Sequence, residues 1–360
     1  MTTFAELTTM QVGGLAAQLI EVTSEEGFIT ALRDAWASSN EWLILGGGSN
    51  TIVGDAGFAG PTILVRTQGI EIIAEHDDGV LVRVAAGQNW DEFVAWAVAE
   101  GLSGVEALSG IPGSVGAAPV QNIGAYGQEL SDTLASIDFL PYGASAAQVM
   151  NADELHLGYR DSAIKQGMVG AVIAVTLRLQ RSAVSRAIMY PQLAQALNVS
   201  VGDTAPLPAV RAAVLNIRAE KGMVLIPGDA DTVSCGSFFV NPIVTESFAR
   251  ALPEDAPRYP LAAEEQDRIL SPGDHVPGFA GPGLVKLSAA WLIENAGVSR
   301  GYQIPGSKAG ISTKHTLAVT NRGGASTDDV TGLARYVQAL VQSHFGIVLR
   351  PEPNLVNCEV

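Results

Sequence analysis

The chain has few of the residue types that would crosslink a protein or bind a structural metal. It contains two cysteines, Cys235 and Cys358, and five histidines that show no metal-ligand spacing. Two thiols cannot build a disulfide framework or a thiolate cluster. We therefore predict no structural metal and interpret Cys235 as a small buried thiol.

Basic residues and long apolar runs are also scarce. Lys and Arg number 21 against 37 Asp and Glu, which gives a net charge of -16, and no basic run interrupts this balance. Such a surface argues against nucleic acid or an anionic membrane as a partner. No apolar run reaches the roughly 18 residues of a membrane span. Residues 1–6 lack the layout of a signal peptide. These absences predict a cytoplasmic protein without membrane insertion.

Length and composition indicate a multi-unit globular protein. The chain has 360 residues, of which 47% are apolar, and 39 glycines. This length suggests two or three compact units. The composition fits a loop-rich enzyme better than a disordered or fibrous protein.

Two glycine-rich stretches, residues 46–50 and 112–127, are the most informative feature. The first follows an apolar run of strand length, Trp42–Leu45, and turns through small residues whose backbone N–H groups suit a diphosphate. Alone, such a triplet is equally compatible with an ordinary tight turn. Glycines and prolines interrupt the second stretch too often for a helix, and its side chains are too small for a core strand. Its backbone must therefore pass close to a flat or charged group. Together they are similar to a flavin-binding cradle.

Periodicity divides the remaining chain into a first unit, a linker and a second unit. A capped helix is predicted to begin at Thr23 or Ser24, and a second helix is predicted over residues 90–101. Strands are predicted over residues 62–66, 70–73, 80–87 and 169–179. Residues 182–208 read as a linker with one exposed aromatic, Tyr190. In the second unit, helices are predicted over residues 210–221, over residues 287–297 and from residue 327 onward. A strand is predicted over residues 315–320, and a surface loop over residues 251–283.

Four further motifs, in order, carry a resemblance to a known family: Gly158–Ser162, Gly236–Pro242, Ala289–Ile293 and Leu349–Glu352. With the glycine-rich stretches, they make the chain similar to the UDP-N-acetylenolpyruvoylglucosamine reductase (MurB) family, in its type I form. The resemblance implies an α+β fold. A two-part FAD-binding domain of the vanillyl-alcohol-oxidase (PCMH) type would occupy residues 1–180, and a linker with a tyrosine loop 181–208. A smaller α/β substrate-binding domain would occupy 209–345, and a C-terminal strand segment 346–360 would carry Glu352.

The same resemblance implies an activity and its cofactors. Family members hold FAD and use NADPH to reduce UDP-N-acetylglucosamine enolpyruvate to UDP-N-acetylmuramate for peptidoglycan, and they are usually monomers. Neither glycine-rich stretch contains His or Cys to link the flavin, which agrees with non-covalent FAD. The implied FAD residues are Gly46, Gly47, Gly48, Ser49, Asn50, Pro112, Gly113, Ser114, Gly116, Ala117, Gln121, Asn122, Ile123, Gly124 and Ala125.

The resemblance assigns the chemistry to Arg160, Glu352 and Ser237. Arg160 suits this electrophilic role, because a guanidinium matches carboxylate geometry and keeps its charge. A carboxylate beside developing negative charge would hinder unless protonated, so we expect partial burial and the substrate carboxylate to favour the protonated form of Glu352. Ser237 would donate the proton, if held close and polarised by Lys221, Asn241 or a water. Outside these motifs, Arg160 would read as a surface ion pair and Ser237 as a turn residue.

The implied substrate residues are Tyr126, Tyr159, Tyr190, Lys221, Asn241, Tyr259 and Gln303. One departure from the family pattern is Val240, where many relatives carry a basic residue; Lys286 and Lys314 are the candidates to replace it. Two alternatives stay open: a flavin oxidase of the same superfamily that uses O2, and a non-catalytic nucleotide-binding regulator. A Rossmann dehydrogenase is disfavoured, since no G-x-G-x-x-G opens a helix after the first strand.

Overall fold

The computed structural model describes residues 1–261 and 283–360, which form two compact units. The larger unit comprises Ala16–Gly48 and Ala59–Val224, and the terminal unit comprises Met1–Leu15, Ser49–Phe58 and Leu225–Val360. The unit boundaries therefore differ from the domain boundaries expected at 180 and 209. The reason is that residues 1–15 and 49–58 pack with the C-terminal part of the chain, whereas residues up to 224 pack with the larger unit.

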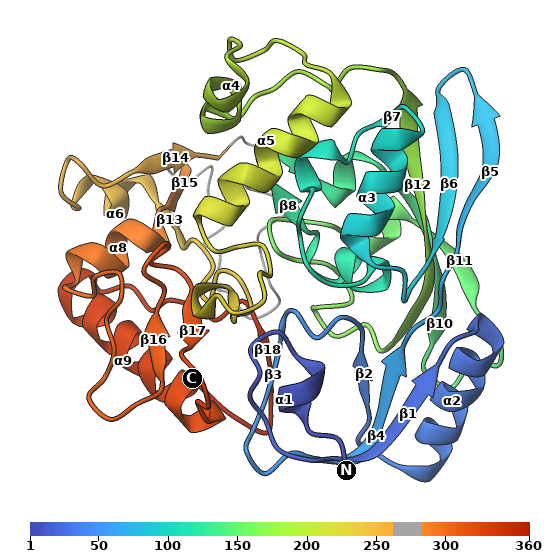
Figure 1. Ribbon diagram of the computed structural model, residues 1–360, viewed down its shortest axis with the longest axis horizontal. Coiled ribbons are helices and arrows are strands. Elements are labelled where there is room, and N and C mark those ends of the chain that lie inside the picture. The colour runs from blue at the N-terminus through green and yellow to red at the C-terminus, as the bar shows by residue number, and fades with distance from the viewer. Residues whose placement is uncertain (262–282) are drawn as a thin grey trace. The chain divides into compact units, whose positions relative to one another are not determined.

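A twisted antiparallel sheet forms the centre of the larger unit (Figure 1). Its strand order is β11-β10-β12-β6-β5, with β7 paired to β12, and the strands are β5 (Ile70–His76), β6 (Gly79–Ala85), β7 (Leu102–Ser103), β10 (Leu134–Pro141), β11 (Gln148–Asn151) and β12 (Gly170–Arg181). Val80, Val82 and Val84 of β6 are buried at alternating positions. Helix α3 (Trp90–Ala99) contributes Trp90, Phe93 and Val94 to the same core.

A second, three-stranded sheet in this unit has the order β1-β4-β2. Its strands are β1 (Ala16–Val22), β2 (Leu43–Leu45) and β4 (Phe58–Val65), and helix α2 (Glu25–Ser38) lies alongside β1 (Figure 1). The Ser24 side chain accepts a hydrogen bond from Gly27 N at 3.1 Å, which confirms the predicted cap. Strands β2 and β4 are parallel, with Leu45 opposite Leu64. Their carboxyl ends therefore meet at one edge.

The segment expected as a linker is folded into the larger unit. It contains helix α4 (Pro191–Leu197), which packs on α5 (Leu207–Glu220) through Leu193, Val210 and Val214. The expectation that this segment is an unpacked linker is wrong, because the side chains of Ile188 and Leu193 are buried. A helix as short as α4 is too short for its apolar periodicity to be recognised in the sequence.

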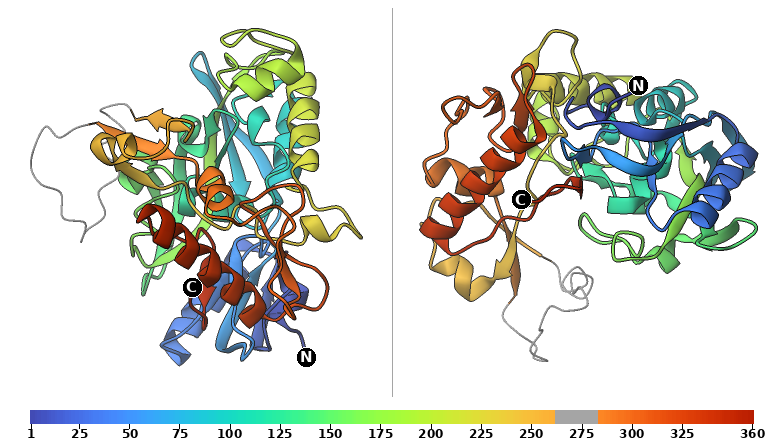
Figure 2. Two further views of the ribbon diagram at one scale, coloured as in Figure 1. Left: turned by 90° about the vertical axis from the view of Figure 1, so that its left-hand side faces the viewer. Right: turned by 90° about the horizontal axis from the view of Figure 1, so that it is seen from below.

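The terminal unit is built on several small sheets and four described helices. Its strands are β3 (Thr51–Val53), β13 (Ile243–Thr245), β14 (Arg258–Pro260), β15 (Leu284–Leu287), β16 (Ala309–Ile311), β17 (Val319–Asn321) and β18 (Asn354–Val356), and its helices are α1 (Phe4–Leu7), α6 (Glu246–Arg250), α8 (Ala289–Asn295) and α9 (Thr327–Phe345). The long helix α9, red in Figure 2, packs on β16 and β17. Val330, Leu333, Val337 and Val341 form its buried face, as predicted.

Two predicted features of this unit differ from the structure. The strand expected over 315–320 is only β17 from Val319, because residues before it make a turn in which Ala318 N donates to His315 O at 3.1 Å. In the expected loop 251–283, residues 258–260 form strand β14, which pairs with β15. The rest of that prediction, over 262–282, lies outside the described residues. Within the described ranges, no helix is long and apolar enough to span a membrane.

Candidate active site

The two glycine-rich stretches lie against each other in the larger unit. A Cβ atom added to Gly46 would fall 2.2 Å from Ser114 Oγ, and one added to Gly47 would fall 2.7 Å from Gly113 Cα. Any side chain at these positions would have to displace the opposite stretch. The pairing thus explains why glycine is needed at both positions.

The sheets place these stretches. Gly46 follows β2 at the carboxyl edge that β2 shares with β4. The second stretch is fixed to the loop after β6, since Gly116 N donates to Ala86 O and Val115 N to Gln88 O at 2.8 and 2.9 Å. A Cβ on Gly116 would lie 2.5 Å from that of Ala86. Ligands of open α/β sheets bind at such carboxyl edges.

The second stretch is more regular than expected. Residues Val115–Gln121 form a 3-10 helix with Pro119 inside it, and Gly124–Ala125 form the short strand β8, which pairs with β9 (Gln128–Glu129). The helix ends at Asn122 in the left-handed conformation, with φ 44°. Asn122 is buried, and its Nδ2 donates to Glu129 and to Gly158 O at 2.9 and 3.1 Å. Its side chain therefore holds the fold, so any cofactor contact would come from its backbone.

Arg160 is tied to the end of this second stretch. Its Nη2 donates to Gly124 O at 2.7 Å and its Nη1 to Asn122 O at 3.3 Å. Its guanidinium carbon lies 5.7 Å from the centre of the Tyr159 ring. Arg160 itself has φ 54°, a conformation that L-residues rarely adopt and that is common at functional sites. The structure thus brings Arg160 and Tyr159 to predicted cofactor residues.

Three more predicted or nearby groups meet around Tyr126, which has φ 51°. The rings of Tyr126 and Tyr190 contact edge to face at 5.4 Å, and Lys221 Nζ lies 5.7 Å from the Tyr126 ring centre. Lys221 also donates to Gln192 Oε1 at 2.8 Å. Tyr190, although 39% exposed, is therefore no isolated linker aromatic. The structure brings Tyr126, Tyr190 and Lys221 together.

Charges crowd this group. Burial and the neighbouring Arg218 guanidinium lower the pKa of Lys221, and burial raises the pKa of Tyr126, partly offset by Arg218. Burial also lowers the pKa of Arg218, whose Nε is buried without a hydrogen-bond partner. Its Nη2 donates to Met223 O at 3.0 Å. The charges of Glu220 and Asp91 offset part of the shifts of Lys221 and Arg218.

In the terminal unit, the serine motif pairs with the segment that carries Glu352. Glu352 N donates to Phe238 O at 2.8 Å, Val240 N donates to Arg350 O at 3.0 Å, and Phe239 bridges to Pro351. Phe238 and Phe239, which take part in this pairing, are buried and anchor the motif. Ser237 is half-buried directly before it. Two of the three predicted catalytic residues are thus held by one stretch of paired backbone.

Asn50, in the first glycine-rich stretch, is hydrogen-bonded to the segment that carries Glu352. Strand β3 runs parallel to β18, with Thr51 opposite Asn354. Asn354 N donates to Asn50 O at 2.9 Å, and Asn50 Nδ2 donates to Glu352 O at 3.3 Å. Ser49 and Asn50 therefore belong to the terminal unit, whereas Gly46, Gly47 and Gly48 belong to the larger one.

Cys235 is buried close to this pairing, as predicted. Burial, aided by the charge of Glu352, raises the pKa of its thiol to about 12. At neutral pH such a thiol stays protonated and is a poor nucleophile. The structure gives it a packing role.

The remaining predicted substrate residues are more scattered over the terminal unit. Asn241 Oδ1 accepts a hydrogen bond from Ala289 N at 2.9 Å and so holds the start of α8. Tyr259 lies on β14 opposite Lys286 of β15 and is 51% exposed. The Gln303 amide donates to Ser307 O. Lys314 forms an ion pair with Asp229 at 2.5 Å.

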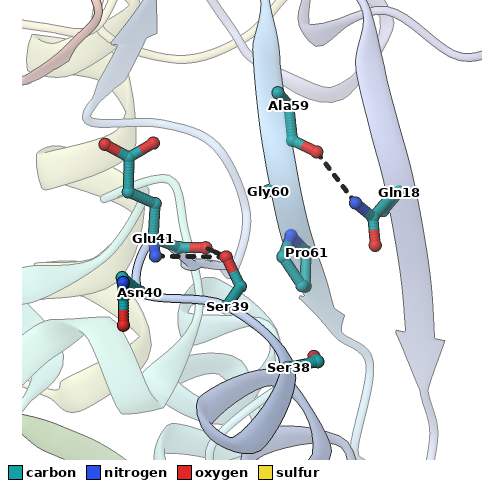
Figure 3. A pocket seen from close by; sticks show the side chains of 8 residues that line it. All are labelled: Gln18, Ser38, Ser39, Asn40, Glu41, Ala59, Gly60 and Pro61. Carbon is teal, nitrogen blue, oxygen red and sulfur yellow. Dashed lines mark hydrogen bonds between the residues drawn. The ribbon is translucent and has the colours of Figure 1, made fainter.

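An open, polar depression lies elsewhere in the larger unit (Figure 3). It is lined by Gln18, Ser38, Ser39, Asn40, Glu41, Ala59, Gly60 and Pro61, at the end of α2 and beside β1 and β4. Gln18 Nε2 donates to Ala59 O across it at 3.0 Å. None of the predicted site residues lines this depression.

The residues that are present fit FAD. The paired glycines leave backbone room and N–H groups for a diphosphate, and no His or Cys stands in either stretch. Sequence reasoning missed Arg66 and Arg218. Arg66 follows a strand and Arg218 lies on a regular helix, so neither stands in a motif. The R-x-x-K spacing of Arg218 and Lys221 is the one signal that could have marked the second of them, because residues three apart share a helix face.

Known proteins resemble this chain over nearly its whole length. Residues 16–141 match the model of an FAD binding domain, and residues 228–356 match the C-terminal domain of UDP-N-acetylenolpyruvoylglucosamine reductase. The reductase of Leifsonia xyli subsp. xyli is 51% identical over 97% of both chains. That of Thermobifida fusca is 48% identical over 98% of this chain and 96% of its own.

A solved structure agrees with these relatives. The crystal structure of the Thermus caldophilus reductase (MurB) superposes with a TM-score of 0.62 at 26% identity, covering 99% of this chain and 97% of that one. Identity and coverage at this level settle the family and the expected fold class. The chain belongs to the UDP-N-acetylenolpyruvoylglucosamine reductase family.

Proposed function

We propose that the chain catalyses the reaction named by its family, the reduction of UDP-N-acetylenolpyruvoylglucosamine to UDP-N-acetylmuramate for peptidoglycan synthesis. FAD is the bound cofactor and NADPH the hydride donor. The observation that carries the proposal is the pairing of the serine motif with the Glu352 segment, within a family whose name states the substrate. We further propose that the reaction takes place in the cytoplasm and that the active form is a monomer.

The FAD cradle consists of both glycine-rich stretches. Bound FAD supplies hydride transfer between NADPH and the enol ether. The N–H groups of Gly46, Gly47 and Gly48 would hold the diphosphate, because this turn leaves a strand as phosphate-binding nests do. The remaining contacts come from residues 112–125. Their close packing on the first stretch leaves no room for a side chain at Gly46 or Gly47.

Arg160 and Glu352 stabilise the charge that develops on the substrate. Hydride addition to the methylene carbon leaves negative charge on the neighbouring carbon and the carboxylate. Arg160 is already oriented by the carbonyls of Asn122 and Gly124, so little reorganisation is needed to meet that carboxylate. Glu352 acts in its protonated form.

Ser237 then donates the proton to the carbon that bears the ether. Ser237 directly precedes backbone that is paired with residues 350–352, which bears on the role because geometry precedes acidity for a weak acid. Tyr126, Tyr159, Tyr190, Lys221, Asn241, Tyr259 and Gln303 bind the UDP-sugar. Of these, Lys221 and Tyr190 are the best suited to bind a diphosphate, because an ammonium group and a phenol both contact the Tyr126 ring.

The test is turnover with defined substrates. Purified protein with FAD should oxidise NADPH rapidly only when UDP-N-acetylenolpyruvoylglucosamine is added, and mass spectrometry should show a product two hydrogens heavier. NADPH oxidation that requires O2 and has the same rate with and without the UDP-sugar would instead support the oxidase alternative, which the comparisons do not favour.

A further inference from the structure

Arg66 is a cation beside the first glycine-rich stretch. It directly follows β4, at the same carboxyl edge where Gly46 follows β2. Its Nη1 donates to Gly46 O at 2.9 Å and to Val65 O at 3.1 Å. The guanidinium is therefore fixed beside the turn that is expected to hold a diphosphate.

The backbone around Arg66 is fixed as well. Arg66 N donates to Val22 O at 2.8 Å. The next residue, Thr67, accepts a bond from Gly87 N at 2.9 Å, and a Cβ on Gly87 would lie only 2.3 Å from Thr67 N. Gly87 in turn follows Ala86, which holds the second glycine-rich stretch through Gly116. Arg66 thus sits on backbone that touches both walls of the cradle.

The charge of Arg66 is not neutralised by a carboxylate among residues 1–261 and 283–360. Every hydrogen bond that Arg66 makes there goes to a neutral carbonyl, and it enters no ion pair, although acids outnumber bases by 37 to 21 in the chain. Nε and Nη2 make no hydrogen bond within these ranges. The side chain is half-buried, so it is held in place but can be reached by a ligand. A held, unneutralised guanidinium with spare donors is suited to a phosphate.

We infer that Arg66 is a cofactor-binding residue that donates to the FAD diphosphate while holding the carbonyl of Gly46 away from it. This inference rests on the proposed cofactor site. The carbonyl bond matters because an inward-turned Gly46 oxygen would repel the phosphates, so the same side chain removes a negative dipole and supplies a positive charge. FMN and riboflavin, which lack the diphosphate, should not benefit in the same way.

The experiment compares flavins with and without phosphate on full-length apoprotein, using quenching of flavin fluorescence to measure Kd. Arg66→Met should raise the Kd for FAD by about tenfold to a hundredfold, the range expected for lost charge-assisted bonds, and change the Kd for riboflavin less than about twofold. Arg66→Lys keeps the charge without the fork and should fall between. The control is Arg33→Met, at an exposed arginine of α2 in the same unit.

Each outcome decides the inference. Equal weakening of FAD and riboflavin binding would reduce Arg66 to a structural residue, and an unchanged FAD Kd would remove it from the site. If Arg66→Met does not fold, Arg66→Lys gives the same comparison, and wild-type FAD affinity must also weaken as salt is raised. Failure of the proposed function is separable, because it would appear as tight FAD binding by wild type without turnover of the UDP-sugar.

Discussion

At the residue scale, the proton transfer proposed for Ser237 would depend on where the residue is held rather than on any unusual acidity. The backbone on its C-terminal side pairs with residues 350–352, and the side chains that follow it are buried phenylalanines. A hydroxyl in such a position can be rigid without being activated. The proton-donor role can therefore be tested by removing one oxygen atom and leaving the motif intact.

We expect Ser237→Ala to leave reduction of the flavin by NADPH unchanged and to slow turnover of the enolpyruvyl sugar by several orders of magnitude. The reason is that only the second half of the reaction needs a proton at the ether carbon. Rapid-mixing absorbance of each half-reaction measures the split. Cys235→Ala, a change of a buried neighbour with no proposed chemistry, is the control and should keep both rates. Equal slowing of both half-reactions in Ser237→Ala would remove Ser237 as the donor.

Lys221 should set an alkaline limit on substrate binding. Burial, with a contribution from Arg218, lowers its pKa, so it loses its charge at a lower pH than an ordinary lysine. Because a diphosphate needs the charged form, KM for the UDP-sugar should rise as pH passes upward through that lowered pKa, while kcat changes less. Lys221→Arg stays charged and should abolish the rise. A pH profile of KM that is identical in wild type and Lys221→Arg would contradict this role.

The motif residues could be predicted because their spacing is distinctive, but their partners could not. Nothing in the sequence around Tyr126 indicates that Tyr190 and Lys221 meet it, since the three residues come from a turn and the ends of two helices. Arg66 and Arg218 were missed for the same reason. Their surroundings, and not their neighbours in sequence, make them unusual.

At the element scale, one ion pair connects α3 to α5 and so supports the helix that carries Arg218 and ends at Lys221. Asp91 accepts two bonds from Arg211, at 2.6 and 2.8 Å, and one from Gly110 N at 2.6 Å. Burial alone would raise the pKa of Asp91, but the bonds from Arg211 and Gly110 bring it below its usual value. The pair is bidentate and partly shielded from water.

Arg211→Met should lower the free energy of unfolding by about 1–2 kcal/mol at pH 7, a value discounted because the Asp91 side chain is 33% exposed. A carboxyl with a lowered pKa stabilises the fold above its unfolded pKa of about 3.9, and this is lost as pH falls through the folded value. The difference between wild type and Arg211→Met should therefore shrink in acid. Urea unfolding at both pH values measures it.

Arg186→Met, at an exposed arginine of the same unit, is the control and should stay within about 0.5 kcal/mol of wild type. A difference between wild type and Arg211→Met that is as large in acid as at pH 7 would mean that packing of the Arg211 stem, and not its charge, stabilises the helix pair.

Elements with local signals were predictable, and those that depend on distant partners were not. Helix α9 begins where Ser326 accepts from Asp329 N at 3.0 Å, a cap visible in the sequence. Strand β17 was predicted too long because its partner β16 offers only Ala309–Ile311 for pairing. Alternation in the sequence cannot show how far the partner extends.

At the scale of the whole molecule, the chain leaves the larger unit at Gly48 and returns to it at Ala59. The intervening strand β3 pairs in parallel with β18, some 300 residues later in sequence. No local pattern predicts such a pairing, so the sequence alone does not show that residues 1–15 and 49–58 pack with the C-terminal part of the chain. The glycine-rich stretch at this crossing therefore contributes to both units.

Hydride transfer from the reduced flavin to the enolpyruvyl sugar is tested most directly by anaerobic stopped-flow absorbance near 450 nm. The protein is first reduced with NADPH and then mixed with UDP-N-acetylenolpyruvoylglucosamine. We expect rapid return of the oxidised flavin absorbance without oxygen. Reoxidation that occurs only after O2 is admitted would contradict it and place the chain with the flavin oxidases.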